Sequence, residues 1–258
     1  MFIGDVFGRP GRLALSHYVP SIVNSEDIDF VIANGENAAG GFGITEKTAK
    51  EIFDSGVRVI TTGNHVWDKK EAVELITRND RLLRPINYPP SVPGFGSGIY
   101  NFGNGMRIGV INLSGRVFMG YMDCPFRAVA PVIVEMRKET NLIVVDVHGE
   151  ATSEKLCLGY YMDGRVSAVL GTHTHVQTAD EKILPKGTAY ITDVGMTGPE
   201  DSIIGVKKEQ ILEKFLNQIP MRYEVAKGAS LFCAVIVDVD DTNGLATGIK
   251  RVTLKYPQ

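Results

Sequence analysis

The chain predicts an α/β fold in which mixed sheets are covered by helices on both outer faces. Short apolar runs alternate with segments of helical spacing through the first half, which is typical of strands and helices in turn. In the second half, pairs of apolar runs flank Asn-Gly steps, which favour antiparallel hairpins. Because 258 residues is near the upper end for one α/β domain, we expect a single domain over residues 1–258, with two small domains as the alternative.

The composition is that of an ordinary folded protein. Hydrophobic residues make up 44% and charged residues 22% of the chain, and its formal net charge of -3 argues against bulk electrostatic capture of nucleic acid. The three cysteines lie far apart, so neither a disulfide framework nor a thiolate zinc site is expected. No apolar run reaches the roughly 18 to 20 residues of a membrane span, and no secretory signal is evident. We therefore expect a cytoplasmic protein without membrane contact.

Each strand expected in the first half is followed by a helix. The expected strands are residues 2–3, 29–33 and 57–62, and the expected helices are residues 10–23, 46–55 and 69–77. Apolar side chains recur at helical spacing in the first helix. Thr45 is a suitable N-cap for the second helix, and Gly56 is a suitable stop. Asp68 followed by Glu71 resembles a capping box that would open the third.

The second half combines hairpins with further helices. The expected strands are residues 99–102, 106–113, 142–147, 167–170, 189–192, 230–238 and 247–255, and the expected helices are residues 125–139, 151–161 and 207–218. Gly103-Asn104-Gly105 would join the first two strands, and Thr242-Asn243-Gly244 the last two. Residues 85–98 are rich in proline and glycine and are expected to form a long surface loop.

The segment Gly171-Thr172-His173-Thr174-His175 directly follows an apolar run. On a strand or its extension, side chains two residues apart point to the same side. His173 and His175 can then reach one point together, which is how a metal site begins. By themselves the two histidines are equally compatible with idle, half-exposed side chains.

Other segments after expected strands carry metal-ligand side chains as well. These candidates are Asp5, Glu36, Asn37, Asn64, His65, His148, His173 and His175. Since ligands bind at the carboxyl ends of strands in α/β sheets, these segments should converge. His17 alone lies elsewhere, in the middle of an expected helix, and is read as a surface or packing residue.

The ligand types predict both the metal and the number of ions. Carboxylates, amide oxygens and imidazoles together suit iron, manganese or zinc, whereas an all-oxygen magnesium or calcium site would not need several histidines. Seven or eight candidate ligands exceed what one ion needs, so two ions are expected. Two adjacent ions are a standard apparatus for attack on phosphorus.

Four motifs, in this order, resemble the calcineurin-like metallophosphoesterase superfamily: Gly4-Asp5, Gly63-Asn64-His65, His148 at a strand end, and Gly171 to His175. Further segments make the chain most similar to the bacterial YmdB-like branch: Asn34-Gly35-Glu36-Asn37, Glu150 to Lys155, Thr172 to Asp180, and Asp193-Val194-Gly195-Met196-Thr197-Gly198. Two departures from the wider superfamily, Phe7 in place of a histidine and Glu36 in place of a bridging aspartate, are shared by that branch.

The resemblance implies a four-layer α/β/β/α sandwich of the metallo-dependent phosphatase type, a homo-oligomer, and hydrolysis of phosphodiesters, with 2′,3′- or 3′,5′-cyclic nucleotides as substrates. It also implies a ligand set in which Glu36 bridges two ions and a metal-bridging hydroxide attacks phosphorus. One ion would be held by Asp5, Glu36, Asn37 and His175, and the other by Glu36, Asn64, His148 and His173.

Other residues are candidates for contact with the substrate. His65 follows a metal ligand and is the candidate general acid; the alternative is that it only orients Asn64 or a neighbouring loop. Arg9 and Arg12 lie at a helix N-terminus, where they would receive phosphate or remain solvated surface residues. The rival functions are a phosphomonoesterase and a catalytically silent scaffold that contacts RNA or protein.

Overall fold

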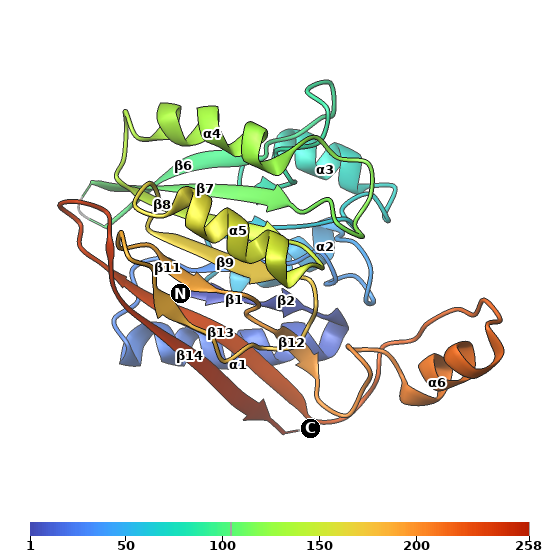
Figure 1. Ribbon diagram of the computed structural model, residues 1–258. Helices are drawn as coiled ribbons and strands as arrows, with labels where there is room; N and C mark the ends of the chain where they lie inside the picture. The colour runs from blue at the N-terminus through green and yellow to red at the C-terminus, as the bar shows by residue number, and fades with distance from the viewer. Residues whose placement is uncertain (104, 258) are drawn as a thin grey trace.

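The computed structural model of the protein describes residues 1–103 and 105–257. Two β-sheets lie face to face, with helices on both outer sides and one helix, α6, projecting from the body (Figure 1). The helices are α1 (Gly8–Ser25), α2 (Glu46–Asp54), α3 (Ala72–Arg78), α4 (Pro125–Met136), α5 (Thr152–Met162) and α6 (Lys208–Asn217). Among the described residues, no helix combines the length and apolar character that crossing a bilayer requires.

The first sheet has eight strands in the order β2-β12-β13-β1-β3-β4-β5, with β14 paired to β13. They are β1 (Phe2–Ile3), β2 (Asp5–Val6), β3 (Ile32–Asn34), β4 (Val59–Thr61), β5 (Leu82–Leu83), β12 (Met196–Pro199), β13 (Ser230–Val239) and β14 (Ala246–Tyr256). β1, β3, β4 and β5 are parallel, whereas β13 runs antiparallel to β1. Phe2 pairs with both Ile32 and Val235, so β1 lies inside the sheet.

The second sheet has six strands in the order β10-β11-β9-β8-β7-β6. They are β6 (Ser97–Phe102), β7 (Met106–Ser114), β8 (Leu142–His148), β9 (Ala168–Thr172), β10 (Lys182–Ile183) and β11 (Ala189–Ile191). The strands β7, β8, β9 and β11 are parallel, and antiparallel strands close both edges. In Figure 1 the arrowheads of β7, β9 and β2 point to the right, so strand ends from both sheets meet on that side.

Three apolar clusters separate the four layers. In β1, Phe2 faces the second sheet while Ile3 faces the helices, because successive strand residues point to opposite faces. The cluster of Ile3 also holds Leu15 of α1 and Ile52 of α2. On the other side, the second sheet packs against Val129 of α4 and Leu158 of α5. The predicted four-layer α/β/β/α sandwich is confirmed, while the single domain over residues 1–258 stays a prediction.

Most expected elements are present, with shifted bounds. Thr45 caps α2 as predicted, and its partner in the capping box is Thr48. β6 and β7 pair as the predicted hairpin, although Asn104 in its turn lies outside the described residues. The capping box assigned to Asp68 and Glu71 is wrong, because α3 begins at Ala72 without a side-chain cap. The short strands β2, β5, β10 and β12 were not predicted.

Candidate metal centre

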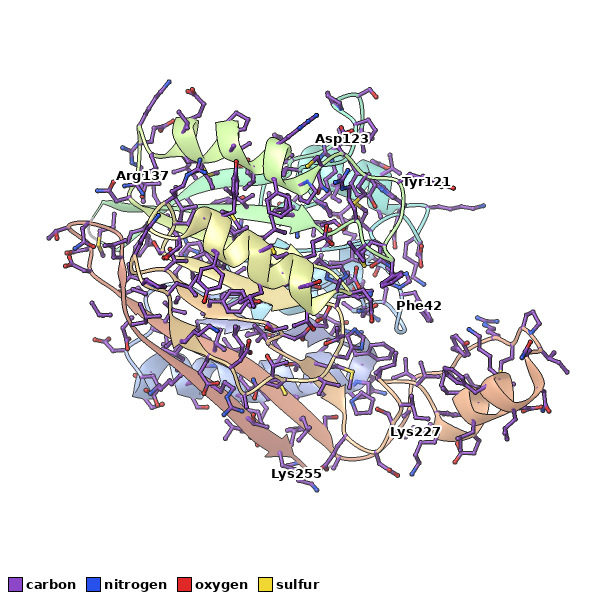
Figure 2. The ribbon with its side chains drawn as sticks, viewed as in Figure 1. Phe42, Tyr121, Asp123, Arg137, Lys227 and Lys255 are labelled. Atoms are coloured by element: carbon purple, nitrogen blue, oxygen red, sulfur yellow. The ribbon has the colours of Figure 1, made fainter. Side chains whose placement is uncertain are left out.

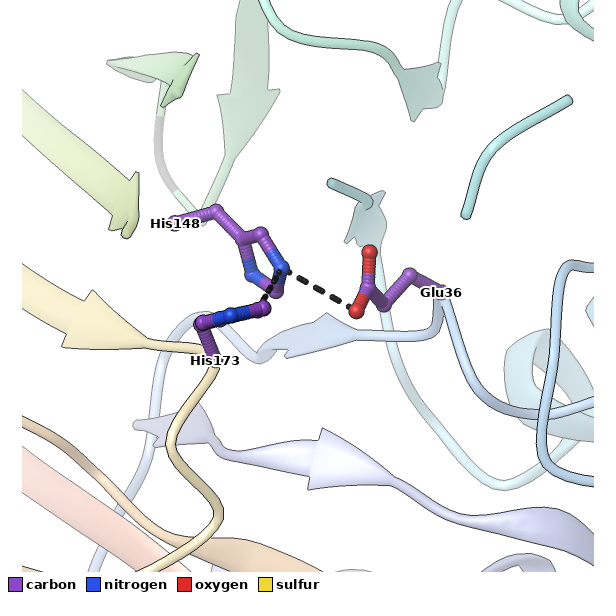
Figure 3. A group of neighbouring side chains, drawn as sticks. All are labelled: Glu36, His148 and His173. Carbon is purple, nitrogen blue, oxygen red and sulfur yellow. Dashed lines mark hydrogen bonds and ion pairs between the residues drawn. The ribbon is translucent and has the colours of Figure 1, made fainter. Parts of the chain in front are cut away.

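Strand ends from both sheets bring the candidate ligands together. Glu36 follows β3, His148 ends β8 and His173 follows β9. One ligand atom from each of these three side chains lies within 4.8 Å of the other two (Figure 3). Asp5 reaches the same region from β2, where its Oδ2 accepts the backbone N–H of His173 at 3.1 Å. The expected convergence therefore occurs between two facing sheets, at the carboxyl ends of their parallel strands.

Three ligand atoms surround the inward nitrogen of His148, Nε2. It lies 3.0 Å from Glu36 Oε1, 3.1 Å from Asn64 Oδ1 and 3.0 Å from His173 Nδ1. A single ring hydrogen cannot serve three acceptors. Adjacent ligands of an ion bound at about 2.1 Å are themselves about 3 Å apart, so the chemistry and spacing of these atoms fit a cation.

Asp5 marks a second place suited to a cation. Its side chain is fully buried, and among the described residues its Oδ1 has no hydrogen-bond partner. This oxygen lies 3.8 Å from Nε2 of His175. The Asn37 amide nitrogen lies 3.1 Å from the same histidine nitrogen and 3.2 Å from Glu36 Oε1, and an amide flip would present its oxygen instead. A buried carboxylate oxygen without a donor is costly, and a cation would satisfy it.

A chain of hydrogen bonds orients the ring of His148. The Thr172 hydroxyl donates to Asp146 at 2.7 Å and lies 2.9 Å from His148 Nδ1. Since the only hydroxyl hydrogen of Thr172 is used on Asp146, the hydroxyl accepts from Nδ1–H. Nε2 is then the nitrogen turned toward Glu36 and Asn64. The sequence argument missed Asp146, although a carboxylate inside the apolar run Leu142–His148 was a usable signal.

The other two histidines are held in the same manner. Nε2 of His173 lies 3.1 Å from a carboxylate oxygen of Glu150, and Nδ1 of His175 lies 3.0 Å from the carbonyl oxygen of Ile204. Each outward nitrogen thus faces an oxygen, which leaves the inward nitrogen as the one available to a metal. A backbone acceptor such as that of Ile204 has no signal in the sequence.

The electrostatics of the group also favour a cation. Burial would raise the pKa of Glu36, but the neighbouring His148 lowers it to about 2. Burial would lower the pKa of His148, but Glu36 raises it to about 9. Burial and then His148 lower the pKa of His173 to about 3, so its ring is neutral at pH 7. A metal ion can replace the proton that His148 carries beside the two buried carboxylates, Asp5 and Glu36.

The route of the chain at His173 and His175 differs from the expected strand extension. β9 ends at Thr172, and the next histidines have positive φ values of 101° and 67°. Such values are uncommon for residues other than glycine. His173 reaches toward His148, whereas His175 reaches toward Asp5. The two rings therefore serve different sides of the group, and simple alternation along a strand does not explain their convergence.

The family model of the YmdB-like protein matches residues 1–252. The chain belongs to the YmdB-like family. Over 254 residues it is 50% identical to a 2′,3′-cyclic-nucleotide 2′-phosphodiesterase of Bacillus subtilis, covering 98% of this chain and 96% of that protein. A putative phosphatase/phosphodiesterase of Mycoplasma genitalium is 34% identical, covering 98% of this chain and 92% of the relative. The family resemblance is thereby confirmed, and these relatives are hydrolases of phosphoric esters by name.

Solved structures share the YmdB-like fold over nearly the whole chain. A hypothetical protein from Thermus thermophilus superposes with a TM-score of 0.93 at 42% identity, covering 99% of this chain and 98% of its own. A novel phosphatase from Mycoplasma pneumoniae superposes with a TM-score of 0.92 at 33% identity, covering 99% of this chain and 92% of its own. Both support the two-sheet architecture on which the candidate centre depends.

His65 lies beside the ligands of this YmdB-like chain. Its backbone N–H donates to Glu36 Oε2 at 3.2 Å, and its Nδ1 lies 2.8 Å from Asp68 Oδ2. The edge-to-face contact with Phe42, at 5.1 Å between ring centroids, limits rotation of the imidazole. Phe42 lies on the right in Figure 2, at the end of the molecule where the strand ends meet. Asp68, expected as a helix cap, is instead the partner of His65.

The two candidate substrate residues, Arg9 and Arg12, have different surroundings. Arg12 is mostly buried and bonds to the Glu51 carboxylate at 2.5 Å and to the carbonyl oxygen of Ala38. These contacts favour a structural role, because they tie the guanidinium to α2 and to the backbone at Ala38. Arg9 is exposed. Phe7, which replaces the superfamily histidine, packs edge-on against His175 with ring centroids 5.5 Å apart.

Proposed function

We propose that this chain is a dinuclear metal-dependent phosphodiesterase that hydrolyses cyclic nucleotides, primarily 2′,3′-cyclic nucleotides and also 3′,5′-cyclic nucleotides. The observation that carries the proposal is the convergence of buried carboxylates and inward histidine nitrogens from two sheets. The named activity of the Bacillus subtilis relative supports the substrate class. A homo-oligomeric state, a cytoplasmic location and contact with RNA stay predictions.

Two ions of iron or manganese, with zinc as the alternative, suit these ligands. One would be held by Asp5, Glu36, Asn37 and His175, and the other by Glu36, Asn64, His148 and His173. Glu36 suits the shared position because its Oε1 lies 3.0 Å from His148 Nε2 and 3.2 Å from the Asn37 amide. When bound, the ions supply positive charge against the phosphate and lower the pKa of water toward neutrality.

His65 supplies the proton in this proposal. Asp68 accepts from Nδ1–H, which leaves Nε2 to carry the proton transferred to the departing ribose oxygen. A positioned acid of this kind contributes about 10² to 10⁴ in rate when the leaving group is poor.

The first experiment measures metal content together with hydrolysis of 2′,3′-cyclic AMP and bis-p-nitrophenyl phosphate. We expect about two ions per chain, loss of both activities on chelation, and recovery on addition of manganese. Faster cleavage of p-nitrophenyl phosphate than of its bis-ester would indicate a phosphomonoesterase instead. Full metal loading without cleavage of any ester would indicate a silent scaffold.

Replacing the general acid should separate substrates by leaving group. In His65→Ala we expect hydrolysis of 2′,3′-cyclic AMP to fall about 10² to 10⁴-fold, because the ribose oxygen needs a proton. Cleavage of bis-p-nitrophenyl phosphate should fall far less, since nitrophenolate leaves unprotonated. Asp68→Asn, which removes only the carboxylate partner, should give a smaller change in the same direction. Equal losses on both substrates, with metals retained, would contradict the acid role.

A further inference from the structure

A buried ion pair lies next to the segment that carries His173 and His175. Lys155 of α5 and Asp193, which follows β11, have side-chain exposures of 1% and 0%, and Lys155 Nζ lies 2.8 Å from Asp193 Oδ2. Taking two charges out of water is unfavourable unless both are well paired. We therefore look for the role of this ion pair in the hydrogen bonds that Lys155 and Asp193 make to other residues, and not in the attraction between their charges.

The ion pair holds the histidine segment on both sides of His173. Lys155 Nζ donates to the carbonyl oxygen of Thr172 at 2.8 Å. Asp193 Oδ2 accepts the backbone N–H of Thr174 at 3.0 Å and its hydroxyl at 2.8 Å. The residues before and after His173 are thus tied to one pair of charges. Asp193 is itself fixed, because its Oδ1 accepts the backbone N–H of Gly195 at 2.9 Å.

The packing leaves the lysine little freedom. A Cβ on Gly171 would lie 2.9 Å from Lys155 Cδ and 1.8 Å from the carbonyl oxygen of Thr192, so glycine is required there. The segment beyond it takes the positive φ values at His173 and His175, which persist only when surrounding contacts fix them. The bonds from Lys155 and Asp193 are such contacts.

We infer that Lys155 and Asp193 are positioning residues that hold His173 and His175 in the conformation that receives metal. The inference about metal rests on the proposed function, whereas the local restraint of residues 172–175 does not. The two charged side chains touch Thr172 and Thr174, not the histidine rings, so they act through the backbone.

The test uses hydrogen exchange and manganese binding on the full chain. In metal-free Asp193→Asn we expect the Thr174 amide to exchange at least tenfold faster, because Asp193 Oδ2 is its acceptor, while amides of β8 keep their rates. The affinity for Mn²⁺, measured by calorimetry, should fall at least tenfold, with full occupancy recovered at higher Mn²⁺ concentrations. Lys155→Met, which keeps the Thr174 bonds, should show a smaller change in both measurements and serves as the test if Asp193→Asn does not fold.

Asp163→Asn is the matched control. Asp163 is also a buried carboxylate at the end of α5, and it accepts backbone N–H groups of Lys186 and Thr188, away from the histidines. It should leave exchange at residues 172–175 and Mn²⁺ affinity unchanged. Folded variants of the ion pair with normal exchange and affinity would overturn the inference, as would acceleration spread equally over β8. If the parent protein binds manganese but cleaves no ester, that result counts against the proposed function alone. The hydrogen-exchange result still decides whether Lys155 and Asp193 restrain residues 172–175.

Discussion

At the scale of single residues, the candidate centre depends on how closely the backbone approaches its ligands. Gly63 lies where β4 gives way to the loop that carries Asn64 and His65. A Cβ at this position would lie 2.2 Å from His148 Cδ2 and 2.3 Å from Glu36 Oε2. Only a residue without a side chain leaves both ligands where they are.

We therefore expect Gly63→Ala to lower Mn²⁺ affinity by about 10 to 100-fold, the range found when the supports of metal ligands are altered. The added methyl group would displace Glu36 or His148, and calorimetric titration of metal-free protein would measure the loss. Gly149→Ala is the control, because it is also next to His148 but its Cβ would meet nothing closer than 3.5 Å. Equal affinities in the two variants would contradict the argument.

Much of the candidate centre could be predicted from residue types alone. Metal-ligand side chains that follow apolar runs, such as Asn64 and His148, can be recognised in the sequence because such residues are rarely needed there for packing. The groups that orient the rings are harder to find. Ile204 acts through its backbone carbonyl, and Asp68 has an equally ordinary use as a helix cap. Their roles depend on contacts that only the folded chain creates.

At the scale of elements, the sequence predicted a helix start correctly where a side chain at the helix end accepts hydrogen bonds from the free backbone N–H groups. The N-cap of α2 is an example: Thr45 accepts from the Thr48 backbone N–H at 3.2 Å, and the Thr48 hydroxyl accepts from the Thr45 N–H at 2.9 Å. The same reasoning gave the wrong start for α3, because Asp68, its expected cap, bonds to His65 instead. Strands of two residues, such as β2 and β5, are too short to show any periodicity.

Thr45→Ala should destabilise the protein by about 1 kcal/mol, because the N-terminal donors of α2 lose their acceptor. Urea unfolding would show this as a lower midpoint with an unchanged slope. Thr45→Ser keeps the hydroxyl and should retain most of the stability. A loss of equal size in both variants would assign the effect to the missing methyl group instead.

At the scale of the whole molecule, the candidate ligands lie between two sheets that meet through apolar side chains and a few buried polar ones, such as Asp146, which accepts hydrogen bonds from Asn34 and Thr61. Asp5 lies in the first sheet and Glu36 follows its strand β3, whereas His148 lies in the second sheet and His173 follows its strand β9. A bound cation would therefore connect the two halves of the sandwich and stabilise the folded chain as a unit.

Manganese should accordingly raise the melting temperature of metal-free protein. At a free concentration 100 times the dissociation constant, one site adds about 2.7 kcal/mol, which is roughly 5 to 11 °C for a chain of this size. Differential scanning calorimetry over a manganese series would measure the rise. Magnesium is the comparison, and it should have a smaller effect because the ligands include several imidazoles. A melting temperature independent of manganese would exclude manganese as a cation that joins the sheets.

The pairing of β1 with β13 also sets an order for folding. Phe2 is paired with Val235, so β1, an inner strand of the first sheet, is completed only by residues far downstream in the chain. Contacts so distant in sequence slow folding, and until β13 pairs, the edge of β1 that faces away from β3 stays open. The ion assigned to Asp5 would be captured only after β13 and β12 have taken their places, because β2, which carries Asp5, pairs with β12. Loading of that ion would then follow the pairing of these downstream strands.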